Sequence, residues 1–477
     1  MQIQAASRTQ HLLPTRLCAD RAASSGLKRR LTAAPTTLSL RVCARSHCWK
    51  AAALASCGIH LHSRWRPKGG RSMSAVRLHA TGTRTSPDVN YKEETREIEL
   101  LGAEDASFDT PATYVVFTRA QPEDAETKLA VVDFPEESAF DLKELGQLEE
   151  FIAHTKFAGT AGTVEVAKPL GGPAVRVVLV GLGKPEQEPD WQQAGAAAGG
   201  AVADLRGGSV RVLLSEAVSV QSFLTGMLPR LHADMRAKGT QTKEDAREAV
   251  GPESIAFVAC TEDVKAGIEK FEKQVEDAKA VSSSVSFARE LVNTTPNFLT
   301  PESMAKAAED LAARFSGCMK VKIIEKEECE KMGMGCYLGV AACSDLPPKF
   351  IHLTYTPPGE VRRKVGVIGK GLTFDSGGYN IKAGAGSMIE MMKFDMGGAA
   401  STLGTAAAVA QLKPEGVEVH FIVASCENMV SGNPGALHPG DILTAMDGTT
   451  VEVNNTDAEG RLTLADAMLY CQDLGVE

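Results

Sequence analysis

Short apolar runs rich in β-branched residues alternate with helix-like segments along most of this chain. In the first half, runs of this kind are bounded by Gly, Pro or acidic residues, as strands are, and they are residues 114–117, 129–133, 163–167, 175–180, 210–214 and 255–259. Helix-like composition at residues 191–206 and 218–236 separates several of them. Strands separated by helices usually form a parallel sheet with helices on its faces, so the alternation predicts an α/β fold.

A chain of 477 residues is too long for a single hydrophobic core, so we expect two domains. Apolar residues recur at three- and four-residue steps from Ile268 to Val285, which predicts a long helix between the domains. Beyond it, strands are expected at residues 320–324, 350–355, 365–368 and 417–424, and helices at residues 399–412 and 462–474. The predicted fold class is therefore α/β, with two domains, each a mainly parallel sheet flanked by helices, joined by a long helix. The predicted boundaries are 88–262 for the N-terminal domain, 263–292 for the linking helix and 293–477 for the C-terminal domain.

Residues 1–87 differ sharply in charge from the rest of the chain. They contain fifteen basic residues and one acidic residue, Asp20, whereas the rest contains 36 basic and 59 acidic residues, so the two parts carry net charges of +14 and −23. A basic, Ser/Thr-rich and nearly acid-free leader is typical of an organelle transit peptide, and a disordered basic tail is the alternative. The leader has no long apolar segment, which disfavours secretion. Its Ser and Thr content favours the chloroplast, with the mitochondrion as the alternative.

The acidic body restricts the partners that we expect. Contacts to phosphate need basic surface, so general nucleic-acid binding is disfavoured. No apolar run approaches the roughly 20 residues of a membrane span, so we expect no membrane partner. Seven of the eleven Cys lie beyond the leader without a C-x-x-C pair, and we expect them to be reduced core thiols.

Carboxylates and basic residues recur in a glycine-rich, otherwise apolar stretch at residues 369–462. Asp375 follows the apolar run at residues 365–368, and Asp395 precedes a predicted helix. Asp457 and Glu459 are two positions apart, so in extended backbone both side chains would point to one side. Four carboxylates at strand ends and loops can hold two divalent ions that activate a water molecule. Each residue taken alone is more often a helix cap or part of a solvated loop.

Other hydrolytic centres find little support in the sequence. There is no H-E-x-x-H motif, the five His beyond the leader are dispersed, and no G-x-S-x-G elbow occurs. A different two-metal hydrolase, such as a phosphatase, is disfavoured because such sites often use histidines.

The same stretch resembles the leucyl (cytosol) aminopeptidase family of dinuclear metallopeptidases. Residues 455–462 (Asn-Thr-Asp-Ala-Glu-Gly-Arg-Leu) are similar to the diagnostic octapeptide of that family, and residues 369–378 and 395–400 are similar to its two other metal-site segments. The likeness extends back through residues 288–293 and 299–302. It therefore covers residues 285–477 well and the first domain weakly.

The resemblance implies a role for each matching residue. The implied metal ligands are Lys370, Asp375, Asp395, Asp457 and Glu459. Lysine coordinates only as a neutral amine, and two adjacent cations would lower its pKa. Lys382 would stay cationic and polarise the scissile carbonyl, and Arg461 would hold a bicarbonate that acts as general base. Met392 and Asn455 match positions that line the substrate pocket.

The resemblance also implies an activity and an assembly. The expected reaction is removal of N-terminal residues, Leu-type preferred, from peptide substrates, and a homohexamer is expected if the protein is full-length. The leader, and not the resemblance, indicates the chloroplast stroma. The expected cofactors are two divalent ions, Zn²⁺ or Mn²⁺ and possibly Mg²⁺, because carboxylate and amine ligands fit all three.

Two departures from the family pattern qualify these expectations. The segment between Lys382 and Asp395 is two residues longer than in bacterial and animal members, as in plant-type members. The family also continues well beyond the octapeptide, so we expect a catalytic domain that is truncated at its C-terminus. The alternative function is therefore a non-catalytic or chaperone-like member of the same fold.

Overall fold

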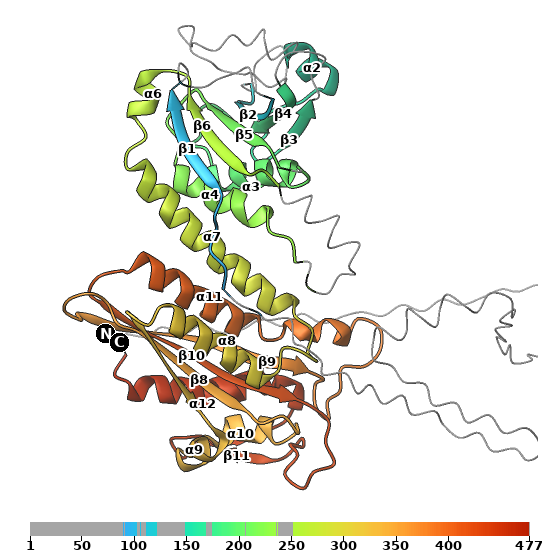
Figure 1. Ribbon diagram of the computed structural model, residues 1–477. Coiled ribbons are helices and arrows are strands. Elements are labelled where there is room, and N and C mark those ends of the chain that lie inside the picture. The colour runs from blue at the N-terminus through green and yellow to red at the C-terminus, as the bar shows by residue number, and fades with distance from the viewer. Residues whose placement is uncertain are drawn as a thin grey trace, which may run out of the picture. The chain divides into compact units, whose positions relative to one another are not determined.

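The computed structural model describes residues 89, 91–102, 105, 111–121, 148–167, 174–205, 207–234, 236 and 251–476 (Figure 1). These residues belong to one compact unit, residues 86–477. The expected transit peptide at residues 1–87 and the expected strand at residues 129–133 lie outside the described residues.

The N-terminal part of this unit contains a six-stranded sheet. Its strands, in spatial order, are β1 (Glu97–Gly102), β6 (Ser254–Ala259), β5 (Ser209–Leu214), β2 (Ala112–Thr118), β4 (Ala174–Gly181) and β3 (Val164–Ala167). All neighbouring pairs are parallel except β3 with β4. The prediction of a mainly parallel α/β sheet is confirmed here. β1 was not predicted, because two glutamates interrupt its apolar pattern.

Helices cover both faces of this sheet. α3 (Trp191–Val202), α4 (Val220–Met227) and the first half of α7 (Phe271–Asn293) share a hydrophobic core with one face, and α2 (Leu148–Thr155) packs on the other. α3 and α4 approach closely at two glycines: a Cβ at Gly195 would lie 1.9 Å from the Phe223 carbonyl oxygen, and one at Gly226 would lie 2.0 Å from that of Gln192. Any side chain at either position would force the two helices apart.

The linking helix differs from the single helix predicted at residues 263–292. It is divided into α6 (Glu262–Ala266) and α7, and between them Lys270 adopts a left-handed conformation with φ of 53°. Left-handed backbone is incompatible with a regular α-helix, so the helix is interrupted at Lys270. The spacing of the apolar residues continues across this interruption and therefore did not reveal it. Phe271 at the start of α7 packs in the first core, whereas Phe287 near its end packs in a second core.

The second core surrounds a four-stranded sheet. Its strands, in spatial order, are β7 (Met319–Ile324), β8 (Lys349–Tyr355), β10 (Val417–Asn428) and β9 (Arg363–Asp375). β9 and β10 are parallel, whereas β7–β8 and β8–β10 are antiparallel. This sheet is therefore mixed and not mainly parallel as predicted, because the order of strands and helices along a chain does not fix the direction of each strand. The strands predicted at residues 365–368 and 417–424 are both present, and both extend several residues further, to Asp375 and Asn428.

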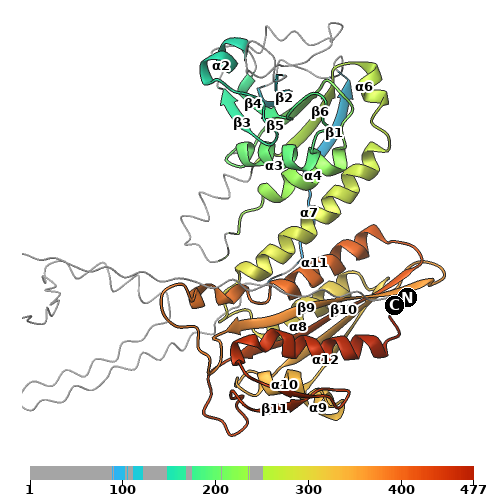
Figure 2. The same ribbon diagram turned by 180° about the vertical axis from the view of Figure 1, so that it is seen from behind.

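Helices also cover both faces of the second sheet. α8 (Pro301–Arg314) and α11 (Gly397–Leu412) lie on one face, and α10 (Gly335–Ala341) and α12 (Glu459–Asp473) lie on the other (Figures 1 and 2). Thr300 caps α8, and its hydroxyl accepts a hydrogen bond from Ser303 N. α9 (Lys326–Lys331) and the hairpin of β11 (Ile442–Thr444) and β12 (Thr450–Glu452) complete this part. No helix among the described residues is long and apolar enough to span a membrane.

A chain of polar side chains joins the second sheet to α12. His352 on β8 lies 2.9 Å through Nδ1 from the Tyr470 hydroxyl and 3.0 Å through Nε2 from His420 Nδ1 on β10. His420 Nε2 lies 3.2 Å from Glu418 Oε1. An ionised carboxylate can only accept, so Nε2 of His420 carries its proton, His352 Nε2–H donates to His420, and the Tyr470 hydroxyl donates to His352. This order of donors and acceptors requires both imidazoles to be neutral.

Candidate metal centre

Asp375 is the last residue of β9 and is almost fully buried, at the carboxyl end of the strand where the sequence predicts it. Leu372 pairs with Cys426 and Asp375 pairs with Asn428, so over this interval β9 contains one residue more than β10. Side chains alternate along a regular strand, and Lys370 and Asp375, five positions apart, would point to opposite faces. The bulge removes this difference, and both residues contribute to the same site.

Asp395 lies between the 3₁₀ helix η3 (Ile389–Phe394) and the start of α11. Its position before a helix was predicted. Burial raises the pKa of the Asp395 carboxyl to about 6, although the hydrogen bond from Lys370 lowers it. Such a shift marks a carboxylate whose charge the neighbouring lysine compensates only in part.

Asp457 and Glu459 are not in extended backbone, contrary to the prediction. Asp457 lies in the 3₁₀ helix η4 (Thr456–Ala458), and Glu459 is the first residue of α12. Backbone N–H groups at a helix start need acceptors, which explains why this acidic segment begins a helix. Glu459 is fully buried, whereas Asp457 is half-buried.

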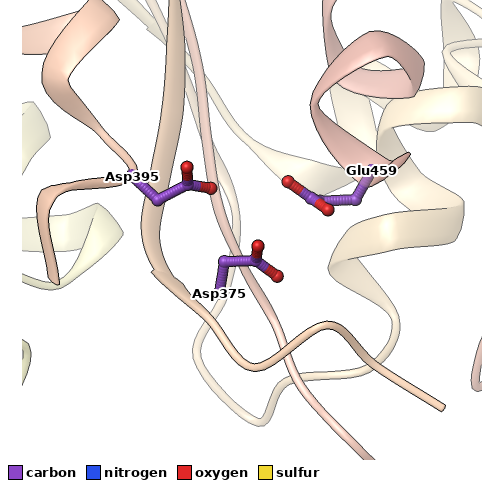
Figure 3. A group of neighbouring side chains, drawn as sticks. All are labelled: Asp375, Asp395 and Glu459. Atoms are coloured by element: carbon purple, nitrogen blue, oxygen red, sulfur yellow. The ribbon is translucent and has the colours of Figure 1, made fainter. Parts of the chain in front are cut away.

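Three of the carboxylates converge although their residues are far apart in sequence. Asp375, Asp395 and Glu459 each offer one oxygen, and these oxygens lie within 4.8 Å of one another. Figure 3 shows the three carboxyl groups turned toward a common space. Among the described residues, this is the one group of acidic, Cys or His side chains with the spacing of a metal site.

Two lysines lie among the carboxylates. Lys370 Nζ is 2.9 Å from Asp395 Oδ2 and 2.7 Å from Glu459 Oε1. Lys382 Nζ is 2.9 Å from Asp375 Oδ2 and 2.6 Å from Asp457 Oδ1. The structure therefore brings together all five proposed ligands and Lys382.

Both ammonium groups are stabilised by this setting. Burial disfavours the charge of Lys370, but hydrogen bonds to Glu459 and Asp395 outweigh it and raise the pKa of the lysine. Burial also opposes the charge of Lys382, and Asp457 and Asp375 raise its pKa well above the usual value. Four carboxylates face two ammonium groups, so the cluster has an excess of negative charge.

These residues fit a pair of divalent ions. Buried carboxylates are stable only when cations compensate them, and here the local lysines supply half the required charge. Hard oxygen ligands suit Zn²⁺, Mn²⁺ or Mg²⁺, and the amine of Lys370, once neutral, could add a nitrogen ligand. With ions bound, the pKa of Lys370 would be pushed downward instead of upward.

Among the described residues, three other predicted site residues form no hydrogen bond or ion pair with the carboxylate groups of the cluster. Arg461 is exposed on the first turn of α12, two positions after Glu459, and none of the described residues forms an ion pair with it. Met392 is half-buried in η3. Asn455 is exposed, and its side chain accepts a hydrogen bond from Asp457 N at 2.8 Å.

Two further residues of the site were missed from the sequence. Thr456 Oγ1 donates to the Gly377 carbonyl at 2.7 Å and accepts from Asn380 N at 2.9 Å, so it fastens η4 to the loop after β9. Asn428 lies between Asp375 and Glu459. The strand predicted to end at residue 424 left Asn428 out, and a strand extended to the same edge as Asp375 would have included it.

Comparisons with known proteins match both parts of the chain. The profile of the cytosol aminopeptidase family, catalytic domain, matches residues 286–476, and that of the N-terminal domain of the family matches residues 122–239. A probable cytosol aminopeptidase of Thermosynechococcus vestitus is 45% identical over 350 residues, which are 71% of this chain and 67% of that protein. Leucine aminopeptidase 2, chloroplastic, of Arabidopsis thaliana is 46% identical over 343 residues, 70% of this chain and 57% of that protein.

A solved structure of a tomato leucine aminopeptidase mutant has the same fold. It superposes with a TM-score of 0.65 and 32% identity, covering 83% of this chain and 74% of the tomato chain. The match to the curated relatives thus spans about two thirds of their length or less. The resemblance predicted from the three motifs is confirmed, as is the class of activity at the level of the family, metal-dependent aminopeptidase. Because both domain models of the family match and the relative from Thermosynechococcus vestitus is 45% identical over 67% of its length, the chain belongs to the cytosol aminopeptidase family.

Proposed function

We propose that this chain is itself a dinuclear-metal aminopeptidase that removes N-terminal residues, preferably Leu, from peptides. The observation that carries the proposal is the convergence of Asp375, Asp395 and Glu459 within 4.8 Å, with two lysines among them. An acidic, buried cluster of this kind has no stabilising role that apolar residues could not fill better. A cluster kept despite that cost is best explained by function.

The proposed ligands are Lys370, Asp375, Asp395, Asp457 and Glu459. Two divalent ions held there supply a Lewis acid for the scissile carbonyl and a water of lowered pKa. Zn²⁺ and Mn²⁺ are the favoured ions, and Mg²⁺ is the third candidate.

Lys382 and Arg461 are the proposed catalytic cations. Lys382 Nζ lies beside Asp375 and Asp457, so once those oxygens bind metal its ammonium is available to the oxygen of the scissile carbonyl. Arg461 is exposed and carries a free guanidinium among the described residues, which suits a bicarbonate that accepts a proton from water. Met392 and Asn455 are proposed to contact the substrate side chain.

The setting of the enzyme is also a proposal. A chloroplast location, in the stroma, agrees with the basic leader and with the chloroplastic and cyanobacterial relatives, and the mitochondrion is the alternative. A homohexamer is proposed for the assembled protein.

Hydrolysis of a leucine chromogenic amide by EDTA-treated protein, with and without added Mn²⁺, tests the activity. We compare the wild type with Lys382→Ala and Asp457→Ala. Lys320→Ala and Asp345→Ala are the matched controls, because both residues are exposed and distant in sequence from the site. Losing an electrostatic or ligand group should lower kcat by roughly a hundredfold or more, whereas the controls should keep full activity.

Two outcomes would count against the proposal. Equal turnover by the wild type and both site variants would mean that the cluster does not catalyse the reaction. A folded wild type that binds Mn²⁺ but hydrolyses no peptide or amide would favour the non-catalytic alternative.

A further inference from the structure

Asn428 is a buried polar residue at the metal centre to which no role has been assigned. It is the last residue of β10, is 0% exposed and pairs with Asp375 across the bulge. Its Nδ2 lies 2.8 Å from Asp375 Oδ1, 3.0 Å from the Thr456 carbonyl oxygen and 3.4 Å from Glu459 Oε2. One amide group thus contacts the end of β9, η4 and the start of α12.

The orientation of this amide is fixed by its surroundings. All three groups around Nδ2 are acceptors, so a reversed amide would place its carbonyl oxygen against three other oxygens. Asn428 Oδ1 is buried and has no hydrogen-bond partner among the described residues. The side chain therefore acts here as a donor.

In the carboxylates of Asp375 and Glu459, the two oxygens have different partners. Asp375 Oδ1 accepts from Asn428 Nδ2 and from Gly377 N at 2.8 Å, while Oδ2 faces Lys382. Glu459 Oε2 faces Asn428, while Oε1 lies 2.7 Å from Lys370. In both carboxylates, one oxygen meets neutral donors and the other faces the cationic side of the site.

The main chain of Asn428 is held as firmly as its side chain. Its carbonyl oxygen accepts from Ser376 N and from Ser376 Oγ, both at 2.9 Å. Because both the main chain and the side chain of Asn428 are already held by hydrogen bonds, its side chain loses no further conformational entropy when a ligand binds.

We propose that Asn428 is a positioning residue of the metal centre, which orients Asp375 and Glu459 so that Oδ2 and Oε1 are presented to the metal ions. The proposal rests on the proposed function and deepens it. A neutral donor is required, since an acid at this position would add a fifth carboxylate to four. Groups that orient metal ligands in this way typically account for 10–100-fold in metal affinity.

The test compares Asn428→Asp and Asn428→Ser with the wild type and with Asn433→Asp, a control at an exposed asparagine. Binding of Mn²⁺ to EDTA-stripped protein is measured by calorimetry and by equilibrium dialysis, without substrate. We expect two ions per chain for the wild type and the control, and a Kd raised about 10–100-fold in both Asn428 variants. The Mn²⁺ concentration for half-maximal activity should rise in parallel, while kcat of Asn428→Ser at saturating Mn²⁺ falls less.

Wild-type Mn²⁺ affinity in a folded Asn428→Ser variant would overturn the proposal. So would loss of the circular-dichroism spectrum in both Asn428 variants, because the amide would then serve folding and not the metal centre. A wild type that binds no Mn²⁺ would instead overturn the proposed function and this inference with it, so the two failures can be told apart.

Discussion

Acidification should weaken the contact between the second sheet and α12 through the buried pair His352 and His420. Burial lowers the pKa of His352 to about 4, with His420 and Lys322 adding to the effect, and burial also lowers the pKa of His420. A proton added to His352 would occupy Nδ1, which could then no longer accept from the Tyr470 hydroxyl, and a proton added to His420 would occupy its Nδ1 and oppose His352 Nε2–H across the 3.0 Å contact. Glu418 is the one nearby group that favours the charged form of His352.

The size of the effect follows from the pKa of His352. In the unfolded chain the ring takes up a proton below about pH 6.5, whereas in the folded chain it stays neutral down to about 4. Its contribution to stability is therefore complete above pH 6.5 and is lost as the pH falls toward 4. At pH 5.0, about 1.5 units below the pKa of the unfolded ring, protonation stabilises the unfolded state by about 2 kcal/mol. The free energy of opening the contact between the sheet and α12 should therefore be about 2 kcal/mol lower than at pH 7.5.

Hydrogen exchange of the β8 and β10 backbone amides measures this change locally. After correction for the intrinsic exchange rate, the wild type should lose about 30-fold more protection between pH 7.5 and 5.0 than a His352→Phe variant, which keeps a ring but does not titrate. Equal losses in the two proteins would refute the reasoning, because the titrating group would then lie elsewhere. His420 remains in both proteins, so its own contribution largely cancels.

Three further perturbations have expected outcomes. Gly460→Ala places a methyl group 2.7–2.8 Å from the Lys370 side chain, so it should displace Lys370 and weaken Mn²⁺ binding about tenfold in calorimetry, with an unchanged circular-dichroism spectrum. Asp466→Ala leaves the buried Tyr337 N–H and the partly buried Met446 N–H without their acceptor. It should destabilise the protein by about 2–4 kcal/mol, seen as a lower Tm in EDTA. Removal of metal by EDTA should lower Tm relative to Mn²⁺ at a hundred times its Kd, by an amount equivalent to about 2.7 kcal/mol, and an unchanged Tm would contradict binding to the folded state alone.

The sequence was most informative where one physical signal acted alone. The β-branched runs of β2, β4, β5 and β6 are buried on both faces and bounded by turn residues, so their existence and positions could be predicted. The break between α6 and α7 could not, because apolar periodicity reports which face is buried and not whether the backbone is continuous.

The site shows a similar limit. The residues themselves pointed to the four carboxylates, whereas Lys370, Lys382 and Arg461 were implied only by the resemblance to the family. The prediction of extended backbone at Asp457 was wrong, because the spacing of two acidic residues does not indicate whether they continue a strand or begin a helix. Asn428 was missed because Ser425, Glu427 and Asn428 are polar, so no apolar pattern predicts that they are buried.

Because of the bulge in β9, the number of residues around it matters to the site as much as which residues they are. Insertion of one residue into β10 between Cys426 and Asn428 would leave every proposed ligand in the chain, yet it would restore regular pairing with β9 and turn Asp375 to the face opposite Lys370. The number of residues that the two strands contribute at the bulge thus decides which face of the sheet the Asp375 side chain lies on. Sequence changes in this family should accordingly substitute Glu427, opposite the bulge, far more readily than they insert a residue beside it.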